Sequence, residues 1–563
     1  MLRTNLLIAS ALAISAVTAA SAAPPTIMVN GVGSSALFNT ASYGAWKNLA
    51  GANALHYTIS GSAPAGSEYP NFAQINDVRP GGGPVQSGTL SVVWNAAVTK
   101  VWVYLNVDSV VGNRSFFSVP RAQLQVDPST ETTPGANKIP SGLWGDDAAG
   151  LPAAIQEAIN NAPFTAAYTD IRPEDAKYAE YRATSPYVAS NLNGLGYGTG
   201  GDTPVGTPIL SSYSSSNATP IDFNIIGNDP ITGEPVPAFV TLSVGADPIV
   251  FIINKENASG LGAPGLPTNT TITDVRNVFE GTTGTIGSLF GITNTTPLNS
   301  VQREPISGTM NTTEFCVFRT HTIQACPTCS QEKGIDPGVT PNSNPLDILT
   351  SGGGVRTRAI GTSQLVGAVQ NPETTTSTLA NQVKSTDMIG YTFFGYGNVA
   401  SIAGSANYGY LELDGIDPIF SAYSNGELPV CNAPCPVTPG SSFPNVRDGK
   451  YVAWSLLRAV TDAAGQANLT NLVKAIEINV DSTVPDFVPY QASENSMGQI
   501  EPGLKLYRSH YVETQLPTNE TPQTPENGIN IATSGCSAEQ GSDVGGEIYK
   551  IPASGCGNLD KRQ

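Results

Sequence analysis

Charged residues are scarce in this chain, since Asp, Glu, Lys and Arg make up only 13% of its 563 residues. Acidic residues outnumber basic ones by 45 to 27, which gives a formal net charge of −18. This balance argues against a nucleic-acid partner, because binding a phosphate backbone needs clustered Lys and Arg. A small anion remains possible as a ligand, because a closed pocket is governed by its local hydrogen-bond donors.

Histidine is equally scarce, and His56, His321 and His510 lie far apart. None of them belongs to an HExxH or a comparable metal-ligand spacing, and the GxSxG turn of many serine hydrolases is absent. We therefore expect no metal site, no cofactor and no enzyme activity. The chain does hold 58 Gly and 43 Pro, which predict many loops and a sizeable β component.

Long apolar runs are missing except at the start, MLRTNLLIASALAISAVTAASA. This stretch has one positive charge at Arg3, an apolar run and the small residues Ala20-Ser21-Ala22, and it predicts a signal peptide over residues 1–22. No later stretch approaches the roughly 18 apolar residues of a membrane span. We expect a monomeric protein that is periplasmic or secreted after the signal peptide is removed.

Cysteine is absent before residue 316, so the seven cysteines can bridge only the later part of the chain. In an exported protein they predict disulfides, with one thiol left over, and we expect a Cys536–Cys556 bridge. Cys326-Pro-Thr-Cys329 and Cys431-Asn-Ala-Pro-Cys435 also have spacings that suit zinc. A redox role for the first pair is a further alternative.

Predicted strands and helices alternate along most of the chain, which favours an α/β fold. Strands are predicted at 25–31, 90–110, 115–127 and 164–170, as an apolar pair within 239–255, and at 387–400 and 410–418. Helices are predicted at 31–51, 151–162, 173–183, 271–281 (starting at Thr271 or Thr273) and 309–318, and a strand with two helices is predicted within 451–480. Residues 185–235 are interpreted as mostly loop.

The stretch GVGSSA has the residue types of a small-anion site. Two glycines allow a tight turn, and Ser34 and Ser35 then offer hydroxyl and N–H groups at a helix N-terminus. The alternative is an ordinary serine N-cap. A dinucleotide site is not expected, because a Rossmann fold would want an acidic residue about 20 positions later, and residues 40–67 contain none.

A second such stretch is VQREPISGTMNTTEF, in which Arg303 lies four residues before Ser307-Gly308-Thr309. The planar guanidinium of arginine can bind two oxygens of one tetrahedral anion. The Ser-Gly-Thr group would open a helix beside it. The alternative is a capped helix next to a surface arginine.

The order of several segments resembles the phosphate-binding proteins of bacterial phosphate ABC transporters and their secreted relatives with an N-terminal Asp-Ile-Asn-Gly. MVNGVGSSALFN is similar to the family's first loop, GDDAAGLPAAIQEAI to its Gly-Ser-Ser-Gly-Gly turn, and FTAAYTDIRPEDAKYA to its Asp-Phe-Gly-Ala-Ser-Asp segment. VGADPIVFIIN resembles the strand that crosses to the second lobe, and ITDVRNVFEG and IGYTFFGYG resemble later elements. REPISGT matches Arg-x-x-x-Ser-Gly-Thr without a gap. The resemblance spans most of residues 26–465.

This resemblance implies a two-lobed periplasmic-binding-protein fold of the second type, with a ligand cleft between the lobes. Lobe 1 would combine residues 24–247 with 450–515, lobe 2 would be residues 248–449, and residues 516–563 would form a loosely ordered tail. Residues 88–126 and 185–235 have no counterpart in the family pattern and are interpreted as β-rich or loop insertions.

From the residue types and the resemblance together, we expect the ligand to contact Ser34, Ser35, Asp147, Asp170, Arg303, Ser307, Gly308 and Thr309. Asp147 departs from the family pattern, because it falls where a serine is expected and a carboxylate cannot donate a hydrogen bond unless it is protonated. An alternative alignment uses Gly196–Asp202, with Thr199 as the donor.

The predicted function is capture of an inorganic oxyanion, phosphate first, for uptake by an ABC transporter in the membrane. The alternative is a secreted structural or adhesive protein that keeps the fold without the ligand. The acidic pair Asp146-Asp147 and the long insertions motivate this alternative.

Overall fold

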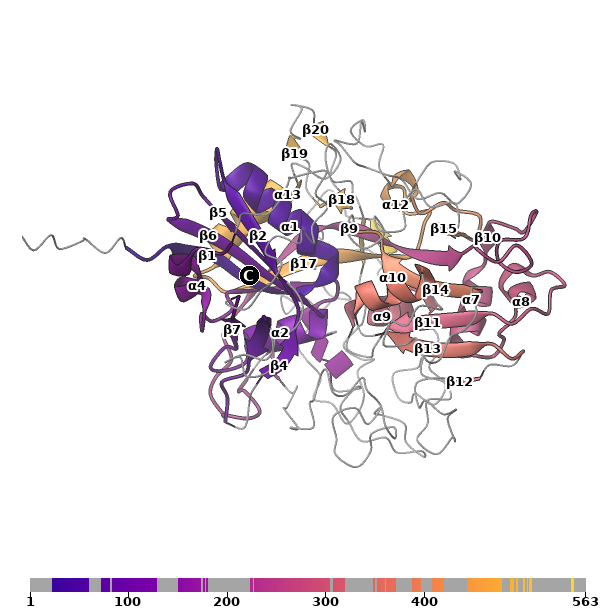
Figure 1. The fold of residues 1–563 in the computed structure, drawn as a ribbon, viewed down its shortest axis with the longest axis horizontal. Helices are drawn as coiled ribbons and strands as arrows, with labels where there is room; N and C mark the ends of the chain where they lie inside the picture. Colours follow the sequence, from indigo (N-terminus) through magenta and orange to yellow (C-terminus); the bar gives the residue numbers. More distant parts are fainter. Residues whose placement is uncertain are drawn as a thin grey trace, which may run out of the picture.

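A mixed β-sheet of 13 strands runs through the described part of the protein (Figure 1). The computed structural model describes residues 23–59, 72–80, 84–128, 150–173, 176–177, 179–180, 223–225, 227–303, 307–318, 348–349, 352–359, 361–370, 387–395, 408–419, 443–477, 487–490, 493–494, 500–501, 504, 506–508 and 548–550. Neighbouring strands follow the order β12 (Ile348–Leu349), β13 (Val355–Ala359), β11 (Asn299–Arg303), β14 (Met388–Phe393), β9 (Val240–Asn254), β17 (Trp454–Thr461), β8 (Ala166–Thr169), β1 (Thr26–Ser34), β6 (Lys100–Val107), β5 (Thr89–Trp94) and β2 (Leu55–Ile59). β15 (Tyr408–Tyr410) and β18 (Val488–Pro489) also pair with β9.

Helices and small sheets surround this central sheet. The helical segments are η1 (Ser35–Leu37), α1 (Phe38–Gly44), η2 (Ala45–Leu49), α2 (Ser109–Phe117), α4 (Ala153–Ile159), α7 (Ile272–Glu280), α8 (Ile286–Phe290), α9 (Gly308–Thr312), η3 (Thr313–Phe318), α10 (Thr362–Gln370), α12 (Pro444–Arg447) and α13 (Gln466–Glu477). The small sheets are β4 (Pro84–Ser87) with β3 (Ala73–Asn76) and β7 (Gln123–Val126), β10 (Asn269–Thr270) with β16 (Glu412–Leu413), β19 (Ser493–Glu494) with β20 (Ile500–Glu501), and β21 (Leu506–Arg508) with β22 (Ile548–Lys550). The predicted α/β fold class is confirmed.

The central sheet consists of two parts that share β9. Its residues Val240–Pro248 pair with β17, and its residues Ile249–Ile253 pair with β14. We call β17, β8, β1, β6, β5 and β2 the first half-sheet, and β14, β11, β13 and β12 the second half-sheet. Figure 1 shows the helices gathered around these halves as two bodies, with β9 and β17 passing between them, as the predicted two-lobed fold requires.

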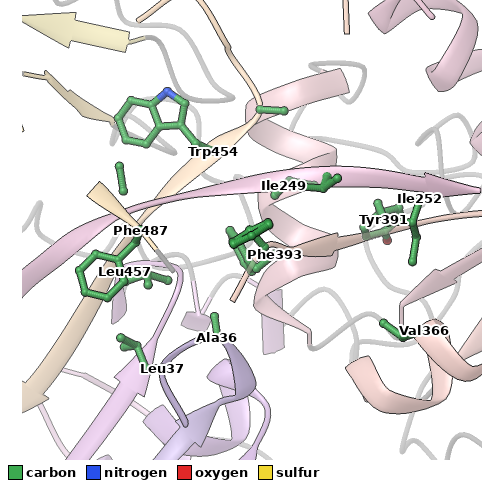
Figure 2. Packing of buried hydrophobic residues seen from close by; sticks show 14 of the residues in the cluster. Ala36, Leu37, Ile249, Ile252, Val366, Tyr391, Phe393, Trp454, Leu457 and Phe487 are labelled. Carbon is green, nitrogen blue, oxygen red and sulfur yellow. The ribbon is translucent and has the colours of Figure 1, made fainter. Parts of the chain in front are cut away.

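Apolar side chains make β9 the centre of the larger hydrophobic cluster. Every residue of this strand except Leu242 is buried, which explains the continuous apolar run from Pro248 to Ile253. Figure 2 shows the cluster following the strand from Leu457 and Phe487, past Ile249, to Tyr391. One continuous core therefore reaches from the first half-sheet into the second.

Helices cover both faces of the first half-sheet, and the side chains of β6 alternate between them. Trp102 and Tyr104 belong to the cluster that includes residues of α1 and α13. Val103 and Leu105 belong to a second cluster that includes residues of α2 and α4. This period of two is the one that an extended strand imposes on successive side chains.

Several secondary-structure predictions are wrong in detail. Residues 115–117, predicted as strand, form the end of α2, and because all nine residues of α2 are buried its sequence lacks the polar face of a surface helix. The predicted strand pair within 239–255 is the single strand β9. After β17 the described chain forms the one helix α13, where two helices were predicted.

Residues 88–126, interpreted from the sequence as an insertion, belong to the framework of the first half-sheet. They form the predicted hairpin of β5 and β6, and β6 pairs in parallel with β1 over most of its length. The adjoining residues of α2 pack beneath the sheet. This segment therefore contributes the strand next to β1 and the loop that follows it.

The structure shows that Thr271, and not Thr273, is the N-cap of α7. The hydroxyl of Thr271 accepts a hydrogen bond from Asp274 N at 3.0 Å and donates one to the Asp274 carboxylate at 2.7 Å. Thr273 lies within the helix and is exposed. A glycine in the left-handed region, Gly281 with φ 77°, ends the helix.

We predict that Thr271→Ala lowers the free energy of unfolding by about 1 kcal/mol, because it removes an N-cap hydrogen bond. Thr273→Ala is the matched control, and it should change stability by less than about 0.5 kcal/mol because that side chain is exposed. Urea denaturation of both variants measures the difference. An equal effect of the two substitutions would contradict the cap assignment.

Candidate functional site

The candidate site lies where parallel strands of both half-sheets end. β1 pairs in parallel with β6 and β8 in the first half-sheet, and β11 pairs in parallel with β13 in the second. The loops after these strands carry most of the residues singled out in the sequence. Ligands of open α/β sheets bind outside the carboxyl ends of such strands.

Ser34 is the last residue of β1 and Ser35 follows it, and the two serines have different partners. The Ser34 hydroxyl accepts a hydrogen bond from Ala36 N at 3.2 Å and caps η1, which is the ordinary N-cap role. The Ser35 hydroxyl reaches the other half-sheet, where it lies 2.7 Å from the Thr362 hydroxyl at the start of α10. Ser35 is half-buried, whereas Ser34 and Thr362 are buried.

Tyr104 of β6 contacts the end of β1 through its hydroxyl and the neighbouring strand β8 through its ring. Its hydroxyl donates a hydrogen bond to the Ser34 carbonyl oxygen, and its ring stacks on Tyr168 with 4.4 Å between ring centroids. Burial raises the pKa of Tyr104 well above its usual value, and the nearby Tyr168 and Asp170 add to this effect. The hydroxyl therefore stays protonated and remains a donor.

Asp108 and Ser109 follow β6, and Asp170 follows β8. The Ser109 hydroxyl donates a hydrogen bond to the Asp170 carboxylate, and both residues are buried. The Asp170 carbonyl oxygen accepts a hydrogen bond from Ser455 of β17. The carboxylates of Asp108 and Asp170 thus both lie at the carboxyl ends of strands in the first half-sheet, on either side of β1.

Arg303, the last residue of β11, contacts both half-sheets. Its Nη2 donates to Asp108 Oδ1 at 2.7 Å, and its Nη1 donates to the Thr362 hydroxyl at 2.7 Å. The side chains of Arg303 and Asp108 are 3% and 4% exposed, so this ion pair is buried. The alternative of a surface arginine is therefore wrong.

The Ser-Gly-Thr group lies at the start of α9, as predicted. The Ser307 hydroxyl accepts a hydrogen bond from Met310 N at 3.3 Å and caps the helix. Gly308 packs directly against the Asp170 carboxylate, so a Cβ added there would lie 1.6 Å from Asp170 Oδ1 and 2.5 Å from Ser109 Oγ. Thr309 follows and is buried.

The structure brings Ser35, Asp170, Arg303 and Gly308 together across the two half-sheets. Ser34 lies next to Ser35 at the end of β1, and Ser307 and Thr309 flank Gly308 at the start of α9. Asp147, the alternative Gly196–Asp202 and every cysteine side chain fall outside the residues that the structure describes, and so does the predicted signal peptide.

Sequence reasoning missed Asp108, Ser109 and Thr362. The first two directly follow the apolar strand VWVYLNV and precede a helix, which is the same signal that marked Ser34 and Ser35. The sequence pattern does not reveal this helix start, because parts of the buried helix α2 have the composition of a strand. Thr362 had no comparable signal, since its place beside Ser35 depends on the packing of the two half-sheets.

The site offers hydroxyl and guanidinium donors together with the Asp170 carboxylate as an acceptor. Such a set can bind an oxyanion that still carries a proton, because this carboxylate can accept a hydrogen bond from it. Within the described residues, no group of three or more His, Cys, Asp or Glu is arranged to hold a metal ion. The described helices also include none that is long and apolar enough to cross a membrane.

No protein-family model matches the chain, and neither does any curated protein sequence. Solved structures with distant similarity include a putative phosphate ABC transporter substrate-binding protein from Clostridium perfringens with bound phosphate. Its identity to this chain is 14% and the TM-score is 0.23, and the match covers 42% of this chain and 65% of that protein. An ABC-type phosphate transport receptor from Vibrio cholerae has 13% identity and a TM-score of 0.23, with 42% and 66% covered. A human phosphate binding apolipoprotein has 11% identity and a TM-score of 0.31, with 81% and 91% covered. The chain thus spans just under two thirds of the first two proteins, and the likeness is a distant one of fold.

We predict that Gly308→Ala disrupts the contact between α9 and the loop after β8, because the new methyl group would overlap the buried Asp170 carboxylate. The affinity for phosphate, the ligand that we propose below, should fall by roughly tenfold or more, since misplacing groups at a site by about 1 Å has effects of this size or larger. Isothermal titration calorimetry with phosphate measures the change.

Gly367→Ala is the matched control. Gly367 lies inside α10, and a Cβ there would meet nothing within 4 Å. This substitution should leave the affinity unchanged and raise the free energy of unfolding by about 0.5–1 kcal/mol, because alanine is the better helix former. An equal loss of affinity in both variants would contradict the close packing of Gly308 on Asp170.

Proposed function

We propose that the protein binds an inorganic oxyanion, with phosphate as the preferred ion, between its two half-sheets. The observation that carries this proposal is the meeting of Arg303, Thr362 and Ser35 from opposite halves at the carboxyl ends of parallel strands. Arginine and hydroxyl donors are the groups that recognise tetrahedral oxyanions. The buried Asp170 beside them would accept a hydrogen bond from a protonated oxygen.

The physiological role that we propose is that of an exported solute-binding protein which delivers the ion to an ABC-type uptake system. The N-terminal signal-like segment supports export, and the sharing of the site by two half-sheets supports capture by closure of two lobes. The lobes would be residues 24–247 with 450–515 and residues 248–449. The sequence motifs that resemble phosphate-binding proteins support the choice of ligand.

A second candidate is a secreted structural protein that keeps this fold without a ligand. The observation in its favour is that the chain's own carboxylate, Asp108, already contacts Arg303. Calorimetry of the purified protein against phosphate, arsenate, sulfate and molybdate separates the two candidates. Heat of binding with any of these ions supports the first candidate, and binding of none supports the second.

We predict that phosphate and arsenate bind and that sulfate does not. Near neutral pH phosphate and arsenate still carry a protonated oxygen that can donate a hydrogen bond to the Asp170 carboxylate, whereas sulfate has none and is repelled. A site built around such a polar pair can reject the analogue that lacks it by several orders of magnitude. Asp170→Asn should relax this discrimination, and calorimetry with phosphate and sulfate on both proteins measures the ratio.

Sulfate binding as tightly as phosphate in the unmodified protein would exclude this role of Asp170. The amide of asparagine keeps the size of the carboxylate and can still accept from Ser109. A change in the phosphate-to-sulfate ratio therefore reports on charge and not on lost packing.

Arg303 should supply the largest single contribution to anion binding. Arg303→Ala is expected to cost about 2–5 kcal/mol of binding free energy, because it leaves the anion without its charged partner. Arg303→Lys should recover only part of this, since an ammonium group cannot reproduce the planar fork of a guanidinium. The affinities are measured by calorimetry, after thermal melts have shown that each variant folds.

Arg121→Lys serves as the control for the Arg303 variants. Arg121 pairs with Asp462 at 2.7 Å near the surface, with side chains 19% and 25% exposed, so the pair should contribute little. Its substitution should leave phosphate binding intact. An unchanged phosphate affinity in Arg303→Ala would remove Arg303 from the site.

A further inference from the structure

Asp108 occupies the N-cap position of α2 but does not cap this helix. An aspartate at this position usually accepts a hydrogen bond from a backbone N–H of the first turn. Here the side chain makes no such bond. Its Oδ1 instead accepts a hydrogen bond from Arg303 Nη2 at 2.7 Å, and this bond connects the first half-sheet with the second. Its Oδ2 accepts a longer hydrogen bond of 3.4 Å from Gln86 Nε2.

This contact places a carboxylate at the point to which a bound anion would be drawn. The guanidinium of Arg303 attracts negative charge, and the N-terminus of the nine-residue helix α2 attracts it as well. Asp108 lies at both positions, because it contacts the guanidinium and stands at the start of the helix. An oxyanion that approaches Arg303 would meet a buried negative charge within hydrogen-bonding distance of the same guanidinium.

We infer that Asp108 is a tethered competitor for the oxyanion on Arg303. An anion binds by taking over the guanidinium group from Asp108, so the affinity of the site is set by the difference between the two contacts. The inference rests on the proposed oxyanion site and adds the residue that limits its affinity. Asp108 acts on every anion alike, because it competes through charge, whereas Asp170 discriminates by accepting a hydrogen bond from a protonated oxygen of the anion.

The same contact links the two half-sheets. Asp108 comes from the loop after β6 and Arg303 from the end of β11, and both side chains are almost fully buried. A buried pair with good geometry holds its partners firmly, since separating them leaves each charge uncompensated. Removing the Asp108 charge should therefore release Arg303 to an anion and loosen the contact between the halves in the ligand-free protein.

Asp108→Asn and Asp108→Ser test the inference. Both new residues are favourable N-caps, so α2 can still begin at Ser109, and thermal melts show whether each variant folds. The dissociation constants of phosphate and of sulfate are measured by calorimetry on the full mature chain. We expect phosphate to bind at least about tenfold more tightly to the variants, which corresponds to roughly 1.4 kcal/mol, and sulfate affinity to rise in parallel.

Asp462→Asn is the matched control. It also removes one carboxylate from an arginine pair. Asp462 follows Thr461, which pairs with the first residue of β8, whereas Asp170 follows the last residue of that strand. The control therefore changes charge at the opposite end of β8 from Asp170. The phosphate affinity of the Asp462→Asn variant should match that of the unmodified protein.

The outcomes separate the inference from the proposed function. Equal or weaker binding by both folded Asp108 variants, with intact binding by the unmodified protein, overturns the competitor role and leaves the oxyanion site standing. Binding by the variants alone supports the competitor role. Absence of binding in every protein overturns the oxyanion site and the competitor role together. If Asp108 had a purely structural role, the variants would bind phosphate more weakly than the unmodified protein, whereas the competitor role predicts tighter binding.

Small-angle X-ray scattering of the ligand-free proteins gives a second measurement that needs no anion. A larger radius of gyration for Asp108→Asn than for Asp462→Asn supports the link between the halves. Equal radii for the two variants overturn that part of the inference.

Discussion

The arrangement of the protein depends on β9, which both half-sheets share. Its first part pairs with β17 and its second part with β14, and nearly all of its side chains are buried. Pro248 lies at the change of partners, where its missing N–H costs little because one ladder ends and the next begins. The two half-sheets are therefore joined through one strand and the core around it.

That constraint explains where the candidate site lies. Because β9 joins the halves edge to edge, the carboxyl ends of β1, β6 and β8 come to face those of β11 and β13. The segments that follow β1, β6 and β8 begin with the short polar residues Ser35, Asp108-Ser109 and Asp170. Glycine is required at position 308, where α9 rests on Asp170 without room for a side chain. The chemistry of the site thus follows from the way in which two parallel sets of strands meet.

Charged residues are few in this chain, but many of them are buried, and some pair across long stretches of sequence. Arg303 pairs with Asp108 across 195 residues of sequence, and Arg79 pairs with Asp229 across 150. Such buried pairs add little stability compared with well-packed apolar residues, but leaving one partner alone is costly. Each pair therefore favours one way of joining distant segments, and the pair at Arg303 does so at the site that we propose for the ligand.

The amino-acid sequence by itself determined the alternation of strands and helices, because apolar periodicity and capping residues act over a few neighbouring positions. It also determined the local chemistry of Ser34-Ser35 and Asp170, which lie at the ends of predicted strands, and of Arg303 with Ser307-Gly308-Thr309, where an arginine lies four residues before the start of a predicted helix. It misled at α2, where a fully buried helix has no polar face to reveal its period.

Only the tertiary structure decided that Asp108 and Thr362 contact Arg303, and that residues 88–126 provide the strand beside β1. These facts depend on which strands become neighbours in the sheet. Strand order is set by the packing of side chains far apart in sequence, and no local pattern of residues records it.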